Sequence, residues 1–203
     1  MSKQKKKSRV QGGWADSSTQ TVQLHPKPQK SVHTFQDTKH MELPPGQRPP
    51  NFSWVIEGVL AGSSLPRQIS HFYYFLNQGI RHIITLSEGK PPMHMAPTGL
   101  YNLFLPIEEF MAPTVDEIKR FVDYVDDARE RQEGVVAHCF WGRGRTGTML
   151  ACYLVKDEGI DPQEAISRIR DQRPYSVETY EQEDAVINYA DHLKSKSSED
   201  QKH

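Results

Sequence analysis

The chain has 203 residues, of which 36% are hydrophobic and 25% charged, and its 25 basic and 26 acidic side chains give a formal net charge of −1. This length suits one folded domain with room for a tail, and the near balance of charge argues against a general binder of polyanions such as nucleic acid. The sequence has no run of 18 apolar residues and begins with polar residues, so we expect neither a membrane span nor a secretory signal. Two cysteines are too few for a disulfide framework, which predicts a cytoplasmic protein.

The beginning of the chain differs in composition from the rest. Residues 1–50 carry nine basic and three acidic side chains, a net charge of +6, which leaves −7 for residues 51–203. The apolar residues of this basic segment follow no helical or strand period, so we predict that residues 1–48 are a disordered basic tail. The basic cluster from Lys3 to Arg9 is either a solvated tail or a contact for polyanions or nuclear import, which would add a nuclear location.

Apolar runs after Pro50 predict the first elements of a folded domain. Residues 54–61 are typical of a hairpin, and residues 69–79 show helical spacing that ends at a glycine. The β-branched run at 80–86 predicts an interior strand, and residues 100–105 predict another.

Helix-start signals define the second half of the domain. Thr114 and Glu117 form a capping box, which predicts a helix that ends at Gly134, before a short buried strand at 135–137. A further helix of good helix formers is expected at 148–156.

The C-terminal part of the domain predicts two more helices. One begins after Asp161, where proline takes the favoured first helical position, and the other begins near Thr179. Because strands alternate with helices, we predict an α/β domain over residues 49–194, with a mainly parallel central sheet flanked by helices. Residues 195–203 are expected to be disordered.

The segment from His138 to Gly147 reads HCFWGRGRTG and carries the chemistry. A buried strand leads into Cys139, and a loop with two glycines leads into a helix, so backbone N–H groups and the positive end of the helix dipole converge there. In that field a thiol ionises below its usual pKa of ~8.5, which makes Cys139 a nucleophile. Arg145 can hold two oxygens of a tetrahedral anion. We therefore predict a phosphate-binding loop, with substrate contacts from Phe140, Trp141, Gly142, Arg143 and Gly144.

This Cys-x5-Arg-Thr pattern resembles the signature loop of the cysteine-dependent dual-specificity protein phosphatases. Residues 50–54, 145–156 and 178–183 are similar to the small atypical members of that family, and the similarity covers roughly residues 49–190. The resemblance implies a protein-tyrosine-phosphatase-like fold and hydrolysis of phosphotyrosine, with phosphoserine and phosphothreonine as further substrates, through a phosphocysteine. It also implies phosphorylated proteins as partners, no obligate nucleic acid, no cofactor and a monomer.

The same resemblance implies roles for further residues. Thr146 matches the hydroxyl that stabilises the departing thiolate, and His138 is expected to hydrogen-bond the loop. In this family the general acid is an aspartate about thirty residues before the cysteine, and here that position is Glu109. Glutamate has the same acid chemistry, so we assign the role to Glu109, with Glu108 as the second candidate and Glu178 as the third. The alternative is that Glu108 and Glu109 are merely solvated loop residues.

Two other functions compete with protein dephosphorylation. The same loop serves phosphatases of non-protein polyanions, such as a phosphoinositide or an RNA 5′-phosphate, and an inactive phosphate-binding module is a third possibility. Arg143 bears on this choice because we expect an apolar residue at its position in the small atypical members. It either contacts a second negative group of the substrate or pairs with an acidic side chain on the surface.

Two further residue classes are expected to take no part in the chemistry. Cys152 lies within the expected helix among apolar neighbours, which predicts core packing, and the nine histidines show no ligand spacing, so no metal is expected.

Overall fold

A computed structural model of the protein describes residues 43–200, with side chains through Lys196. Five strands form one sheet in the order β1-β2-β5-β3-β4. Their bounds are Ser53–Ile56 (β1), Leu60–Ser63 (β2), Ile80–Thr85 (β3), Tyr101–Phe104 (β4) and Gly134–His138 (β5). β1 and β2 are antiparallel, and the other neighbours in the sheet are parallel. The predicted mainly parallel sheet is therefore confirmed.

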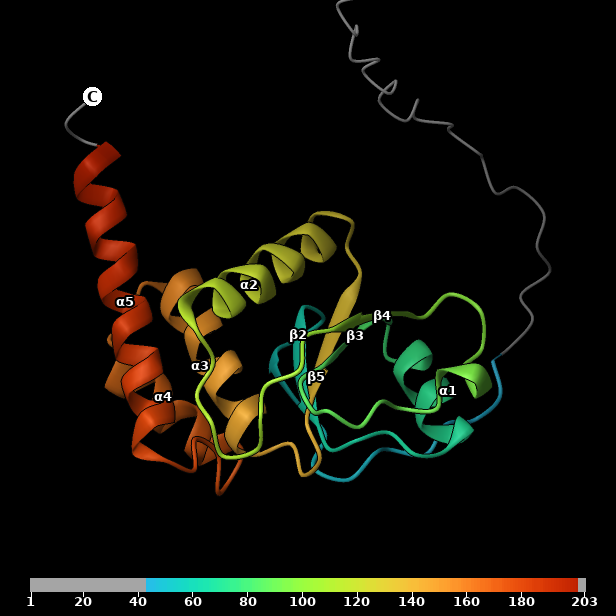
Figure 1. The fold of residues 1–203 in the computed structure, drawn as a ribbon. Coiled ribbons are helices and arrows are strands. Elements are labelled where there is room, and N and C mark those ends of the chain that lie inside the picture. Colours follow the sequence, from blue (N-terminus) through green and yellow to red (C-terminus); the bar gives the residue numbers. More distant parts are fainter. Residues whose placement is uncertain (1–42, 201–203) are drawn as a thin grey trace, which may run out of the picture. The chain divides into compact units, whose positions relative to one another are not determined.

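Helices cover both faces of this sheet. They are α1 (Ile69–Asn77), α2 (Val115–Glu130), α3 (Gly144–Glu158), α4 (Pro162–Gln172) and α5 (Tyr180–Asp200), with a short 3-10 helix at Met93–Met95. Figure 1 shows α1 on one side of the sheet and α2 to α5 on the other. Side chains alternate accordingly along β5, because Val135 and Ala137 pack toward α2–α5 whereas Val136 packs toward α1. None of the helices described is both long and apolar enough to cross a membrane.

Two of the predicted helix starts are confirmed by their capping groups. The Thr114 hydroxyl accepts a hydrogen bond from the backbone of Glu117, and the Glu117 side chain accepts one from Thr114 in return. The Asp161 carboxylate accepts the Gln163 N–H at 2.9 Å, directly before Pro162.

The start of α3 differs from the prediction, because the helix begins at Gly144 rather than at Thr148. Two glycines in its first turn lower the intrinsic helix propensity, but tertiary packing overrides that preference. A Cβ on Gly147 would lie 2.6 Å from the Cβ of Ser176, so the neighbouring loop approaches this turn as closely as a glycine permits. The earlier start places Arg145 and Thr146 on the helix rather than in the loop.

The domain is longer at both ends than the predicted span of 49–194. Gln47 N–H donates to the carbonyl of Ser70, and Asn77 donates to that of Pro44, so residues 44 and 47 pack onto α1. α5 continues to Asp200, so part of the predicted disordered C-terminus is helical. The rest of the predicted tail, residues 1–42, and residues 201–203 lie outside the described residues.

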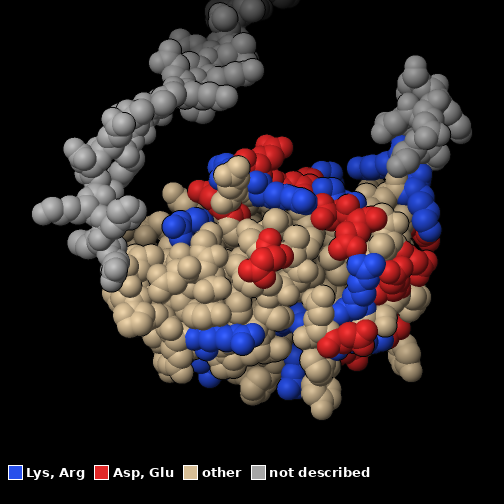
Figure 2. Space-filling view, turned by 180° about the vertical axis from the view of Figure 1, so that it is seen from behind, with Lys and Arg blue, Asp and Glu red and all other residues tan. Residues whose placement is uncertain are grey.

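Charge is unevenly spread over the face seen in Figure 2. Lys, Arg, Asp and Glu side chains crowd together on the side where α4 and α5 lie, at the right of the view, and broad areas of the remaining face carry none of them.

Candidate active site

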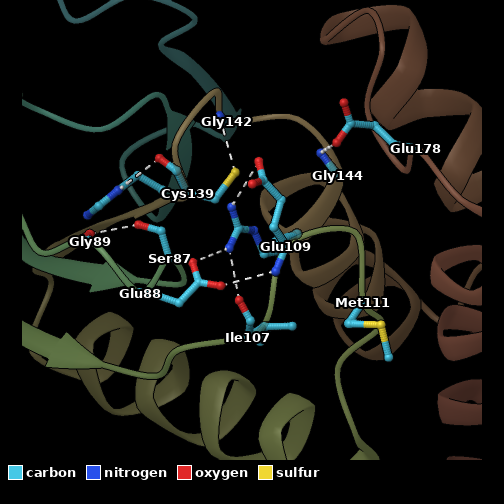
Figure 3. Close-up of polar contacts among 12 residues, drawn as sticks. Ser87, Glu88, Gly89, Ile107, Glu109, Met111, Cys139, Gly142, Gly144 and Glu178 are labelled. Carbon is cyan, nitrogen blue, oxygen red and sulfur yellow. Dashed lines mark hydrogen bonds and ion pairs between the residues drawn. The ribbon is translucent and has the colours of Figure 1, made fainter.

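The predicted phosphate-binding loop, residues 139–143, joins the carboxyl end of β5 to the first turn of α3. β5 lies between β2 and β3 and is parallel to both, so the loop leaves the sheet at the edge where ligand sites of α/β folds form. Cys139 is 3% exposed, and its sulfur accepts a hydrogen bond from Gly142 N–H at 3.2 Å (Figure 3). The nucleophile candidate therefore lies at the base of the loop, with a backbone donor directed at it.

Partners outside the loop bind each of its first four carbonyl groups. Cys139 O accepts from His138 Nδ1 at 3.2 Å, and Phe140 O accepts from Leu65 N at 3.2 Å. Asn51 Nδ2 donates to both Trp141 O, at 3.0 Å, and Gly142 O, at 2.9 Å. Arg173 Nη2 donates to Gly142 O as well, at 2.8 Å.

Because these carbonyl groups are held in one direction, the directions of the loop N–H groups are set as well. The C=O and N–H of one planar trans peptide unit point in opposite directions, so a carbonyl held outward turns the next residue's N–H inward. Asn51 holds Trp141 O, and the N–H of the same peptide unit is the Gly142 group that reaches the Cys139 sulfur. No residue in the described part of the chain accepts from the N–H groups of Phe140, Trp141 or Arg143. Three donors are thus left for an anionic ligand.

Gly142 is required by this arrangement. Its φ is +71°, in the left-handed region that glycine adopts without strain. A Cβ at this position would also lie 2.3 Å from the carbonyl oxygen of Ser63, at the end of β2.

Arg145 lies in the first turn of α3 with its side chain 5% exposed. Its Nη1 donates to the Glu88 carboxylate at 2.8 Å and to the carbonyl of Ile107 at 2.9 Å. Its Nη2 lies 3.8 Å from Glu109 Oε1. The guanidinium thus contacts Glu88, Ile107 and Glu109.

Glu88 connects the candidate arginine to the candidate acid loop and was not predicted from the sequence. One of its carboxylate oxygens binds Arg145, and the other accepts the backbone N–H of Glu109 at 3.1 Å. Hydrogen bonds from its own backbone N–H and from Arg145 hold the pKa of Glu88 below its usual value, so it stays an anion near neutral pH.

The three acid candidates occupy different surroundings. Glu109 is about half exposed, with its carboxyl group turned toward the loop of Cys139, and it lies 3.8 Å from Arg145 (Figure 3). Glu178 instead accepts the N–H of Gly144 at 2.9 Å, so it caps the first turn of α3. Glu108 is exposed and takes part through its backbone carbonyl, which accepts from Met111 N–H. Of the three carboxyl groups, that of Glu109 is the one that lies within 4 Å of the Arg145 guanidinium.

His138 is buried and hydrogen-bonded at both ring nitrogens. A carbonyl can only accept, so Nδ1 carries the proton that goes to Cys139 O, and Nε2 accepts from the Thr85 hydroxyl at 2.9 Å. Thr85 in turn accepts from Asn102 Nδ2 at 2.8 Å, so β5, β3 and β4 support the loop jointly. Burial lowers the pKa of His138 to about 4, so the ring is neutral at physiological pH.

Thr146 and Cys152 follow the loop on α3. The Thr146 hydroxyl is buried and has no partner among the described residues, so it is available to donate to a thiolate or a ligand. Cys152 is fully buried in the core as predicted, and burial raises the pKa of its thiol. Cys152 is thus packed among apolar side chains, whereas the sulfur of Cys139 accepts a hydrogen bond from a loop N–H.

Arg143 does not form the surface ion pair that one of its two interpretations required. Its guanidinium lies over the ring of Tyr175, with a distance of 4.9 Å from Cζ to the ring centroid, and no carboxylate pairs with it in the described part of the chain. Phe140 and Trp141, which precede it, are 39% and 59% exposed at the rim of the loop.

Asn51 and Arg173 are the other site residues that sequence reasoning did not identify. Arg173 is 1% exposed, and besides Gly142 O it binds Gly62 O at 3.0 Å and the Ser53 hydroxyl at 2.6 Å. Burial lowers the pKa of Arg173 to about 10, which still leaves it charged. Asn51 has a φ of +53°, which asparagine tolerates better than most residues. The sequence signals for these two residues were that Asn51 follows two prolines and that Arg173 precedes Pro174, just after α4.

Within residues 43–196, no three His, Cys, Asp or Glu side chains are grouped as metal ligands.

Comparisons with known proteins agree with this geometry. The family described as "PTP-SAK: Swiss Army Knife protein, DSP-PTPase phosphatase domain" matches residues 49–186. The phosphatidylglycerophosphate phosphatase PTPMT1 of Arabidopsis thaliana is 30% identical over 118 residues, 55% of this chain and 34% of that protein. The human dual specificity protein phosphatase CDC14C is 33% identical over 107 residues, 52% of this chain and 23% of that protein. The matched part of this chain thus spans about a third or less of the length of both relatives.

Among solved structures, the crystal structure of Tk-PTP in the active form superposes with a TM-score of 0.63 at 25% identity, covering 70% of this chain and 97% of that one. The fold seen here is therefore that of known phosphatases of the tyrosine-phosphatase type.

Proposed function

Because this chain belongs to the Swiss Army Knife family of DSP-PTPase phosphatase domains, we propose that it hydrolyses phosphotyrosine in proteins, and phosphoserine and phosphothreonine as well, through a phosphocysteine intermediate. One observation carries the proposal: the carbonyls of residues 139–142 are all held outward, and the N–H groups above the Cys139 sulfur are left for three oxygens of a phosphoryl group.

In the first step, the Cys139 thiolate attacks phosphorus in line with the leaving oxygen. The S–P bond forms as the P–O bond to the substrate breaks, and Glu109 gives its proton to the departing oxygen. Arg145 and the loop N–H groups bind the three equatorial oxygens, where negative charge is held in the transition state.

In the second step, water replaces the sulfur. Glu109, now ionised, accepts a proton from the water that attacks phosphorus, and the S–P bond breaks to release inorganic phosphate. The Thr146 hydroxyl, unpartnered in the protein, donates to the thiolate that leaves. The role of Glu109 in both steps is supported by its carboxyl group, which is about half exposed and lies 3.8 Å from Arg145 Nη2.

Aromatic side chains at the rim support phosphotyrosine as the main substrate. Phe140 and Trp141 are exposed on the loop, and Phe110, beside the proposed acid, is 61% exposed. A phenyl ring whose phosphate lies in the loop would contact such side chains, which interact favourably with other rings.

A lipid phosphate is the second candidate. The Arabidopsis relative is a phosphatidylglycerophosphate phosphatase, and it is as similar to this chain as the protein phosphatases are. An inactive binding module is disfavoured, since Cys139, Arg145 and Thr146 are all present and the loop is intact.

A substrate panel tests the proposal. The purified full chain is assayed on phosphotyrosine, phosphoserine and phosphothreonine peptides and on vesicles with phosphatidylglycerophosphate or a phosphoinositide, with Cys139→Ser as the inactive control. We expect the highest kcat/KM on phosphotyrosine peptides. A lipid hydrolysed at least about tenfold faster than every peptide would replace the proposed substrate class, and Cys139→Ser used as a substrate trap would then identify the captured species.

The chemistry needs a reduced thiol at position 139, which supports the cytoplasm or nucleus as the location. We propose a monomer, since the site is built from a single chain.

A further inference from the structure

A groove of about 920 Å³ adjoins the loop that holds Cys139. It shares Phe140, Trp141 and Arg143 with that loop. The other walls come from residues 47–51, from the segment 64–71 that enters α1, and from the turn at residues 174–175 after α4. A substrate held in the loop can therefore extend into this groove.

The groove is lined by basic side chains and by no acidic ones. Arg48, Arg67 and Arg143 line it, and no aspartate or glutamate does, although residues 51–203, which supply most of its walls, carry a net charge of −7. None of the three arginines pairs with a carboxylate in the described part of the chain. By contrast, Arg129, Arg131, Arg168 and Arg170 all form ion pairs with acidic side chains.

Contacts with aromatic rings hold these arginines in place without using up their hydrogen-bond donors. The Arg67 guanidinium lies 4.7 Å from the centroid of Phe140, and that of Arg143 lies 4.9 Å from the centroid of Tyr175. Arg48 lies over Phe52 and donates to its backbone carbonyl. A guanidinium has five N–H donors in a fixed fork that matches a carboxylate, so most of the donors in the groove are still unused.

We propose that this groove binds acidic side chains that flank the phosphorylated residue of a protein substrate. This proposal rests on the proposed function, and it specifies which residues the enzyme prefers beside the phosphorylated residue of its substrate. One or two carboxylates near the phosphate would pair with arginines that have no other anionic partner. The groove also carries the side-chain amides of Gln47 and Gln68, which supply both donors and acceptors for an extended peptide backbone. A residue two to four positions from the phosphorylated one reaches roughly 7–14 Å along the substrate, far enough to pass the rim of the loop.

Two phosphotyrosine peptides test this preference. They are identical except that the acidic residues flanking the phosphotyrosine in one are replaced by asparagine and glutamine in the other. The measured quantity is the ratio of kcat/KM for the acidic peptide to that for the neutral one, so any general loss of activity in a variant cancels. The full chain is compared with Arg67→Gln and with the double variant Arg48→Gln/Arg67→Gln, and Arg120→Gln, an exposed arginine on α2, is the matched control.

We expect wild type and Arg120→Gln to prefer the acidic peptide by about tenfold. Arg67→Gln should reduce the ratio by roughly three- to fivefold, as for one exposed or partly buried ion pair, and the double variant should bring it close to one. The wild-type preference should also shrink as salt is raised, because exposed charge pairs are screened over ~8–10 Å at physiological ionic strength.

Four results would overturn one or both proposals. An equal kcat/KM on both peptides in the wild type, or an unchanged ratio in the double variant, would overturn the role of the groove while leaving the proposed phosphatase activity intact. If the arginine variants slow hydrolysis of phosphoinositide vesicles but not of the acidic peptide, the groove binds a lipid headgroup instead. If an aryl phosphate is hydrolysed but no phosphopeptide is, the proposed function itself fails.

Discussion

α3 and α4 are consecutive helices that pack against each other, yet their first turns are built in opposite ways. The first turn of α4 is capped by adjacent residues. The Asp161 carboxylate accepts the N–H of Gln163, and Pro162 has no N–H that needs an acceptor. At α3 the N-cap residue, Arg143, makes no side-chain capping bond. The N–H of Gly144 is bound instead by Glu178, 34 residues later in the sequence.

This difference separates a structural helix start from one prepared for a ligand. A locally capped turn has fewer free donors, so it offers less to an anion. The loop before α3 has N–H groups without acceptors in the described part of the chain, and their direction is set by distant partners of the adjacent carbonyls. Five experiments follow from this contrast.

The largest effect is expected from Cys139→Ser. Replacing the nucleophile should lower kcat/KM by at least about 10³-fold, because no other group can form the covalent intermediate. Binding of inorganic phosphate should persist, since the N–H groups and Arg145 are unchanged. The matched control is Cys152→Ala on α3, which should keep its turnover while losing about 1 kcal/mol of unfolding free energy. Turnover of Cys139→Ser within tenfold of wild type would contradict the assignment.

Glu109→Gln should act in proportion to how much the leaving group needs a proton. We expect kcat on phenyl phosphate to fall by roughly 10²–10⁴-fold, and kcat on 4-nitrophenyl phosphate to fall much less. Glu108→Gln is the matched control on the same loop. Equal slowing of both substrates would indicate a displaced loop rather than a lost acid. A selective loss in Glu108→Gln or Glu178→Gln would move the role to that residue.

The buried ring of His138 should make the free energy of unfolding depend on pH. Its folded-state pKa, about 4, lies below its unfolded value near 6.5, so at low pH the unfolded chain binds a proton that the folded chain does not. Stability should therefore be fully present above pH 6.5 and should decline as pH falls toward 4, by about 3 kcal/mol in total. Denaturant unfolding of wild type and His138→Asn across this window measures the contribution. Parallel curves for the two proteins would show that His138 does not titrate in this way.

Asn51→Asp should disturb the loop without removing any residue from it. The change replaces the donor that holds Trp141 O and Gly142 O with a carboxylate, which repels both carbonyls. We expect kcat/KM to fall about tenfold, because the N–H groups lose their direction. Asn77→Asp, which affects an exposed bond to Pro44, is the control, and an unchanged kcat/KM in Asn51→Asp would show that the loop keeps its geometry without this donor.

The smallest effect is expected from a change at the locally capped start of α4. Asp161→Ala removes the cap of α4 and should lower the free energy of unfolding by about 1 kcal/mol. Its kcat/KM should equal that of the wild type, because nothing in the first turn of α4 faces the loop. A fall in activity with unchanged stability would mean that the two helix starts are coupled.

Much of the fold followed from local signals in the sequence. Capping boxes, apolar periodicity and β-branched runs depend on residues close together in the chain, so the strands and the starts of α2 and α4 lie where they were predicted. The predicted end of α2 was wrong, because the helix ends at Glu130 and Gly134 begins β5. The start of α3 was wrong, because the packing of Gly147 against Ser176 overrides helix propensity there.

The candidate site was predicted only in its local part. Cys139 and Arg145 lie on one continuous motif, and their catalytic roles stay predictions. Asn51, Glu88 and Arg173 were missed because their contacts are with backbone atoms or side chains from other parts of the chain, and no local sequence signal identifies those distant partners.

The partners of the loop have a consequence for how activity arises during folding. Asn51 and Trp141 are 90 residues apart in the sequence, and Arg173 and Ser53 are 120 apart. Contacts of such high sequence separation carry a large loop-closure cost and form late. During synthesis Cys139 leaves the ribosome well before Arg173 and Glu178 do. The contacts that hold the loop around Cys139 are therefore complete only when α4 and the start of α5 have docked.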